Sequence, residues 1–111
     1  MSLGHEQEIF TTHVVSLIQT AWSLGYQVRI GEVFRTPEQQ ALYVTTRRSE
    51  TMNSMHLKKC AIDLVLLRNN KICGYEEIKP LGDFWESLDP KNRWGGNWKK
   101  LVDTPHFERR V

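Results

Sequence analysis

The sequence predicts an α+β fold in a single domain, with a small antiparallel sheet flanked by helices. Its 111 residues are close to the commonest domain size, and 40% hydrophobic with 25% charged residues is typical of a globular protein. Helix-like patterns come first, and the strand-like runs that follow are mostly joined by turns short enough for hairpins. Elements segregated in this way favour an antiparallel sheet.

A helix and then a strand are predicted at the start of the chain. Apolar residues near helical spacing indicate a helix over residues 6–24, which Gly25 ends. These residues are Ile9, Val14, Leu17, Ile18, Ala21 and Trp22. Residues 27–34 alternate well enough for a strand. The side chains expected on one face of that strand are Val28, Ile30 and Phe34.

The next segment predicts a capped helix and a loop. Thr36 is suited to cap the helix, Pro37 to occupy its first position, and Glu38 to place an acid in its first turn. We expect this helix to extend to about Thr45. Residues 46–53 are polar and predict an exposed loop.

A hairpin is predicted in the middle of the chain. Residues 60–67 indicate a strand, Asn69-Asn70 a tight turn, and residues 71–74 a returning strand.

The last third is predicted to contain one helix, one loop and one short strand. Residues 76–88 indicate a helix that Pro80 interrupts or delays. Residues 89–98, rich in Pro, Gly and Trp, indicate a loop, and residues 106–109 a final strand.

The net charge, the lengths of the apolar runs and the number of cysteines make some classes of function less suitable for this chain. A net charge of +2 and a pI near 8.6 are too weakly basic to argue for nucleic-acid binding, although they suit an anionic polymer such as a bacterial cell wall. No apolar run approaches the ~20 residues that cross a membrane, and the first residues lack the pattern of a secretory signal. Cys60 and Cys73 are too few for a disulfide scaffold, so we expect buried free thiols.

Two histidines and a carboxylate are candidate metal ligands. Asp63 lies inside the apolar run 61–67, where a buried carboxylate is costly unless it is paired or binds a metal. The alternative is that Asp63 faces solvent from a half-buried strand. His56 precedes Asp63 by seven residues, which excludes a same-face helical pair but permits a loop and a strand to converge. His106 begins the last predicted strand.

One more carboxylate and one arginine are candidates for catalysis. Pro105 favours an extended residue before it, so the chain bends there and can bring Asp103 beside a metal without ligating it. Three protein ligands with an open fourth position are the arrangement of a catalytic zinc site, and the spare carboxylate would be the base. Arg35 stands between a predicted strand and helix, where functional side chains are common; the alternative is an ordinary surface arginine.

Together these segments resemble the peptidase M15 family, which includes D-Ala-D-Ala dipeptidases, D,D-carboxypeptidases and the L-alanyl-D-glutamate endopeptidases of phage lysins. The family's arginine between a strand and a helix is matched within residues 33–40. Its S-x-H-x-x-G-x-A-x-D pattern is matched by residues 54–63. Its acid three residues before a terminal histidine is matched by Asp103 and His106.

Two details qualify the resemblance. Residues 80–85 with 92–98 look most like the phage lysin branch. Lys59 stands where many members have glycine, so we expect a local change of shape without loss of a ligand.

The resemblance implies a Hedgehog/DD-peptidase-like fold with one Zn²⁺ per chain, held by His56, Asp63 and His106. It implies that Asp103 is the catalytic base. It also implies that Arg35 stabilises the oxyanion of the tetrahedral intermediate, where preorganised charge contributes most.

Three further residues are expected at the substrate site. Ser54 is a partner that orients a ligand residue. Trp94 and Gly95 are expected to wall the peptide groove, with core packing as the alternative for Trp94.

The function that the resemblance implies is a zinc-dependent peptidoglycan peptidase over residues 1–111. We expect an L-alanyl-D-glutamate endopeptidase of phage lysin type that cleaves stem peptides, acts as a monomer, and neither binds nucleic acid nor inserts into membranes. We expect synthesis in the bacterial cytoplasm without a signal peptide, with holin-dependent access to the cell wall.

Three other functions stay open at this point. One is a D-alanyl-D-alanine carboxypeptidase or dipeptidase of the same family. Another is a mononuclear iron oxygenase, since two histidines and one carboxylate also form that triad. The last is a non-catalytic zinc-containing wall-binding domain, although a binding module needs neither Asp103 nor Arg35.

Overall fold

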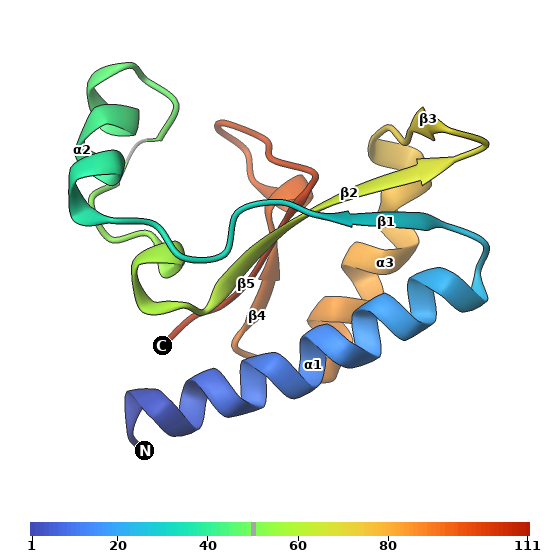
Figure 1. The fold of residues 1–111 in the computed structure, drawn as a ribbon, viewed down its shortest axis with the longest axis horizontal. Helices are drawn as coiled ribbons and strands as arrows, with labels where there is room; N and C mark the ends of the chain where they lie inside the picture. Colours follow the sequence, from blue (N-terminus) through green and yellow to red (C-terminus); the bar gives the residue numbers. More distant parts are fainter. Residues whose placement is uncertain (50) are drawn as a thin grey trace.

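The computed structural model describes residues 1–49 and 51–111, and over these residues the fold is α+β, as predicted (Figure 1). The helices are α1 (Leu3–Ser23), α2 (Pro37–Thr45) and α3 (Tyr75–Leu88), with short 3-10 turns η1 (Met55–Lys58) and η2 (Gly95–Asn97). The strands are β1 (Gln27–Ile30), β2 (Ala61–Arg68), β3 (Lys71–Ile72), β4 (Asn92–Trp94) and β5 (His106–Arg109).

All strand pairs in the sheet are antiparallel, in the order β1-β2-β5-β4, and β3 also pairs with β2. The long strand β2 is the centre of this arrangement: its first residues pair with β5, and its later residues pair with β1 and β3. The β2–β3 turn is made by Asn69 and Asn70, both with positive φ, which confirms the predicted hairpin. The returning strand is shorter than predicted, because it ends at Ile72 and not at residue 74.

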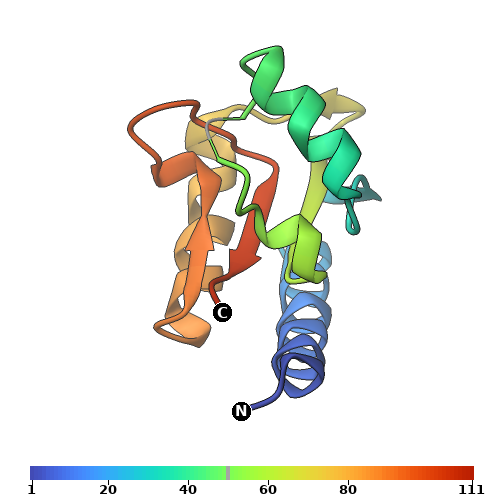
Figure 2. The same ribbon diagram turned by 90° about the vertical axis from the view of Figure 1, so that its left-hand side faces the viewer.

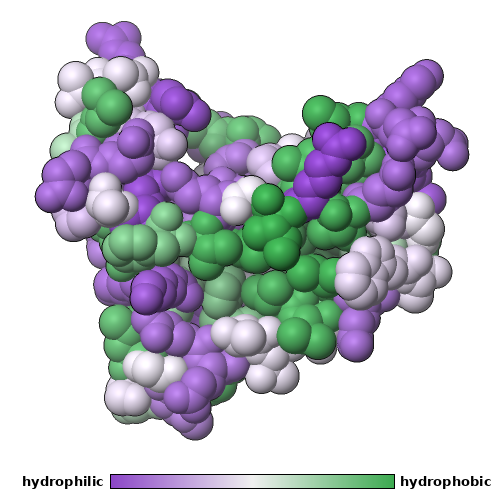
Figure 3. Space-filling view, viewed as in Figure 1, coloured by the Kyte–Doolittle hydropathy of each residue, from purple (hydrophilic) through white to green (hydrophobic). Residues whose placement is uncertain are grey.

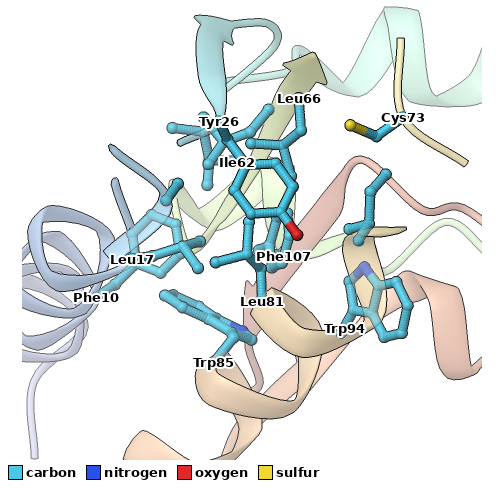
Figure 4. Close-up of a cluster of buried hydrophobic side chains, with 13 residues drawn as sticks. Phe10, Leu17, Tyr26, Ile62, Leu66, Cys73, Leu81, Trp85, Trp94 and Phe107 are labelled. Carbon is cyan, nitrogen blue, oxygen red and sulfur yellow. The ribbon is translucent and has the colours of Figure 1, made fainter. Parts of the chain in front are cut away.

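The hydrophobic core lies between one face of the sheet and the two helices α1 and α3 (Figure 4). Phe10 of α1, Trp85 of α3 and Phe107 of β5 meet there edge to face. Along β2, alternation sends Ile62, Leu64 and Leu66 into this core. The same alternation turns Asp63 to the opposite face.

A buried ion-pair network fastens α1 to the end of β5. Glu6 accepts hydrogen bonds from Lys91 Nζ at 2.9 Å and from Arg109 Nε at 2.7 Å. Arg109 also lies 3.1 Å from an Asp89 carboxylate oxygen. The network joins parts of the chain that are more than 80 residues apart.

Several sequence predictions are confirmed at this level. Thr36 caps α2, with Pro37 at its start, and α2 ends at Thr45. Cys60 and Cys73 are free and buried. Of the predicted exposed loop over residues 46–53, residue 50 lies outside the described residues, and the neighbours with an assigned environment are mostly exposed.

Other predictions about the helices and strands were wrong. The strand predicted over residues 27–34 ends at Ile30, and Ile30 and Phe34 are 66% and 51% exposed. The segment 89–98 is not only a loop, because it contains β4 and η2. Pro80 lies inside α3 without interrupting it. β4 depends on pairing with β5, and such distant partners leave no local signal.

The surface on the side of α1 and β1 shows a hydrophobic band across its centre, flanked by hydrophilic side chains (Figure 3). Even so, none of the helices in the described part of the chain combines the length and apolarity required to cross a membrane.

Candidate metal centre

A cleft of about 1050 Å³ opens on the face of the sheet opposite the core. Its lining residues come from α2, the loop after it and η1 on one side, and from the segment 98–103 that leads into β5 on the other. Figure 2 shows how the backbone of these two parts is arranged, with α2 and η1 in green and the segment before β5 in orange to red. Six of its residues matter most for the chemistry: Arg35, Tyr43, Asp63, Trp98, Asp103 and His106.

Strand pairing places Asp63 and His106 together. They are directly opposite each other in the β2–β5 ladder, where side chains on one face are neighbours. Asp63 Oδ1 lies 3.3 Å from His106 Nδ1.

His56 is brought to the same point by η1. The Ser54 hydroxyl caps this turn by accepting a hydrogen bond from the His56 amide at 3.2 Å. The His56 ring donates from Nδ1 to the Val33 carbonyl, 2.8 Å away, because a carbonyl can only accept. Its Nε2 therefore carries the lone pair, and it lies 3.3 Å from Asp63 Oδ1.

The two histidines present opposite ring nitrogens to Asp63. The nitrogen nearest Asp63 is Nε2 in His56 and Nδ1 in His106. The other nitrogen of His106, Nε2, donates to a Glu108 carboxylate oxygen at 2.7 Å. Each ring thus has one nitrogen fixed by an acceptor and the other directed to the same small space.

This arrangement fits a divalent metal ion. One ligand atom from each of His56, Asp63 and His106 lies within 4.8 Å of the others. Ligand atoms of a tetrahedral zinc site are separated by roughly 3.3 Å, close to the two histidine–carboxylate distances. His56 Nε2 and Asp63 Oδ1 are buried without a hydrogen-bond partner, which is costly unless something else satisfies them.

The contacts at the candidate metal centre shift the pKa values of Asp63 and His106. Burial opposes ionisation of Asp63, but the neighbouring imidazoles of His106 and His56 outweigh it and hold the pKa of the Asp63 carboxyl well below its usual range. Burial also opposes protonation of His106, yet its contacts with Asp63 and Glu108 raise the pKa of His106 to about 9. The carboxylates therefore favour a cation between the rings, either a proton or a metal ion.

Asp103 lies beside the three ligand candidates and not among them. Its Oδ2 is 3.9 Å from His106 Nδ1, across the bend that Pro105 makes. Its backbone amide donates to the Gly95 carbonyl at 3.0 Å. A Cβ on Gly95 would lie 2.3 Å from the Asp103 carbonyl oxygen, so only glycine permits this approach. Burial raises the pKa of the Asp103 carboxyl.

Arg35 is held on the opposite wall. Its guanidinium contacts Glu32, with Nε 2.6 Å from Oε1, and donates from Nη1 to Gln40 at 2.7 Å. It also lies over the Tyr43 ring, 4.6 Å from the centroid. The backbone amide of Arg35 donates to the His56 carbonyl, which ties this segment to η1.

The structure places Trp94 in the core, which was the alternative to its expected place in the wall of the groove. The Trp94 side chain is fully buried between Gly82 and Gly96, so it packs in the core and does not wall the groove. Its indole donates to the Thr104 carbonyl at 2.8 Å, which supports the segment that carries Asp103. Trp98 lines the cleft instead, with its ring 4.8 Å from that of His106.

Sequence reasoning missed the residues that hold the candidates in place. Glu32, Gln40 and Tyr43 surround Arg35, and Glu108 holds His106. The available signal for Glu108 was strand alternation, since residues two apart on β5 share a face. Gln40 carried no comparable signal, because its burial is decided by tertiary contacts.

Lys59 adopts a left-handed backbone conformation, with φ 56° and ψ 35°, at the end of η1. Glycine reaches this region without steric cost, which explains why glycine suits the position. With Lys59 in this conformation, the predicted ligands His56 and Asp63 on either side of it still lie together.

The sequence is similar to those of known peptidases. The model of an M15 peptidase family, described as D-alanyl-D-alanine carboxypeptidase, matches residues 47–109. An L-alanyl-D-glutamate peptidase of Listeria phage A118 is 34% identical over 94 residues, which cover 83% of this chain and 34% of the relative. The chain therefore spans about a third of the length of that curated relative.

A solved structure shares the fold. The crystal structure of a Serratia marcescens L-Ala D-Glu endopeptidase matches with a TM-score of 0.67 and 25% sequence identity. The match covers 86% of this chain and 76% of the other.

Proposed function

Because this chain belongs to the M15 peptidase family, we propose that it is a zinc-dependent endopeptidase that cleaves the L-alanyl-D-glutamate bond of peptidoglycan stem peptides. The bond is the one named for both the phage relative and the Serratia neighbour. The proposal includes one Zn²⁺ per chain, catalysis by a monomer, and action on the bacterial cell wall.

The observation that carries the proposal is the pair of orphaned ligand atoms beside a separate carboxylate. His56 Nε2 and Asp63 Oδ1 are buried without partners, whereas Asp103 stands outside the ligand set. A structural metal site is normally closed by four protein ligands, and a catalytic one keeps a position open. Three ligands with a neighbouring base support the catalytic type.

Each residue has a role that follows from its position. His56, Asp63 and His106 would hold the ion, and a bound Zn²⁺ would supply Lewis acidity and lower the pKa of water. Asp103 takes the proton of the attacking water and passes it to the leaving amine. Arg35, fixed by Glu32 and Gln40, donates to the oxyanion of the tetrahedral intermediate without reorganising.

Digestion of purified peptidoglycan tests the proposal. We expect new amino termini at D-glutamate, read by mass spectrometry, and loss of this activity on chelation with recovery on adding Zn²⁺. Chelator-resistant activity, or a wall left intact by the zinc-loaded protein, would exclude the proposed function.

A second candidate function has a specific observation in its favour. The matched family model is described as D-alanyl-D-alanine carboxypeptidase, whose reaction would release free D-alanine. The same digest separates the two, because only the endopeptidase leaves D-alanine in the stem and exposes an amino group on D-glutamate.

A further inference from the structure

Residues on one face of β5 and just beyond it form a continuous chain of polar contacts that starts at the candidate metal centre. His106 Nε2 donates to Glu108 Oε1 at 2.7 Å, and Arg110 Nε donates to Glu108 Oε2 at 2.9 Å. The three residues are two apart, so they share a face of the extended chain. Both oxygens of the Glu108 carboxylate therefore have a partner.

Glu108 is unusually enclosed for a carboxylate. The residue is 6% exposed, and burying a charge is unfavourable unless it is paired. Its place in the fold does not require a carboxylate, since its backbone already pairs with Ala61 of β2 and Arg93 of β4. The side chain is therefore best explained by what it does to His106.

The hydrogen bond decides which nitrogen of His106 faces the site. A half-turn of the imidazole about the Cβ–Cγ bond would put Cδ2 in the place of Nδ1 and Cε1 in the place of Nε2, so the ring would lose its contacts with both Asp63 and Glu108. The tilted contact with the Trp98 ring does not distinguish the two orientations, because the ring plane stays nearly the same. A carboxylate accepts and never donates, so Glu108 favours the orientation with N–H on Nε2 and the lone pair on Nδ1. Nδ1 is the atom that lies 3.3 Å from Asp63 Oδ1.

We propose that Glu108 is a positioning residue that selects Nδ1 of His106 as a metal ligand and strengthens binding of the ion. Such a carboxylate also makes the imidazole a better electron donor, and loss of such a partner typically weakens metal affinity by about 10–100-fold. His56 is held the other way round, with Nδ1 donating to the Val33 carbonyl, a backbone group that carries no net charge. The two histidines of the site thus have one neutral partner, the Val33 carbonyl, and one charged partner, the Glu108 carboxylate. This inference rests on the proposed metal-dependent function.

Zinc affinity, measured by competition with a chromophoric chelator, tests the proposal without any assay of turnover. We expect Glu108→Ala to bind zinc about 10–100-fold more weakly than the unmodified protein. Glu108→Gln keeps an acceptor but loses the charge, so we expect a smaller loss of about tenfold. Glu8→Gln makes the same chemical change on the exposed side of α1 and should leave the affinity unchanged.

The nitrogen resonances of the histidines give a second readout. In the zinc-loaded protein, long-range proton–nitrogen spectra should show His56 bound through Nε2 and His106 bound through Nδ1, with a proton on His106 Nε2. In Glu108→Ala this proton should exchange faster, or the ring should bind through Nε2. Thermal melting identifies variants that do not fold. If Glu108→Ala does not fold, the zinc affinity of Glu108→Gln tests the proposal in its place.

The possible outcomes separate the two proposals. If the unmodified protein binds no zinc, the proposed function fails. If it binds zinc but both folded variants match its affinity, or His106 is bound through Nε2 in the unmodified protein, the role of Glu108 is refuted while the proposed function stands.

Discussion

The Asp103 carboxylate and the His106 imidazole lie 3.9 Å apart, on either side of the bend at Pro105. The separation is too long for a hydrogen bond and leaves Asp103 outside the set of ligand atoms. This position is compatible with the role that we propose for Asp103, a base that acts on a molecule bound at the centre and is not itself a ligand.

Asp103→Asn should retain the metal and lose most of its turnover. The amide keeps the shape of the side chain but cannot take a proton, and a general base contributes about 10²–10⁴-fold. We expect kcat to fall by this factor, with zinc content measured by elemental analysis unchanged. Asp83→Asn, on the exposed side of α3, is the matched control. Loss of zinc in Asp103→Asn would make Asp103 a ligand.

Arg35→Lys should be damaging although it preserves the charge. The guanidinium contacts Glu32, Gln40 and the Tyr43 ring at once, and an ammonium cannot reproduce this planar set of donors. Because an oxyanion partner acts mainly in the transition state, we expect kcat to fall by about 10²-fold with little change in KM. Steady-state kinetics beside Arg29→Lys, on exposed β1, would check this. Equal activity in both variants would remove Arg35 from the mechanism.

Lys59→Gly should stabilise the protein. Lys59 has a positive φ of 56°, where a side chain is strained and glycine is not. We expect the free energy of unfolding to rise by about 0.5–1 kcal/mol, measured by denaturant titration. The neighbouring Lys58→Gly should lower it, because Lys58 lies within η1 and lacks this strain. A loss of stability in Lys59→Gly would show that Lys59 makes compensating contacts.

Glu6→Gln should weaken the attachment of α1 in a pH-dependent way. Hydrogen bonds from Lys91 and Arg109 lower the pKa of Glu6 in the folded state. A lowered pKa contributes stability above the pKa of the unfolded state, and this contribution is lost as the pH falls through the folded value. The melting temperature of Glu6→Gln should thus be several degrees lower at pH 7, and the difference should shrink below about pH 4.

Thermal melts from pH 3 to pH 7 measure this effect. Glu8→Gln, which alters an exposed carboxylate two residues away, should follow the unmodified protein throughout. A pH-independent difference for Glu6→Gln would mean that side-chain packing, and not the ion pairs, accounts for the loss.

Local patterns in the sequence were enough for most of the helices and for the central hairpin. Thr36 and Pro37 mark the start of α2 through their own backbone preferences, and Asn69-Asn70 makes a turn because these residues tolerate positive φ. β4 and the early end of β1 could not be predicted in this way. Both depend on hydrogen bonds to strands that are distant in the sequence.

The same division holds for the candidate site. The sequence by itself was sufficient to single out His56, Asp63, His106 and Asp103, because metal ligands and bases must be particular residue types and a proline bend has a particular shape. Tertiary structure alone decided that Trp98 lines the cleft while Trp94 is buried, since both tryptophans stand in similar Gly-rich surroundings.

Tertiary structure also decided how each ligand is oriented. Which nitrogen a histidine presents depends on the acceptor beside its other nitrogen, here the Val33 carbonyl for His56 and the Glu108 carboxylate for His106. One acceptor is 23 residues away in the sequence and the other only two. Neither pairing is encoded by residue type, because a hydrogen bond is a matter of distance and direction that only the folded chain determines.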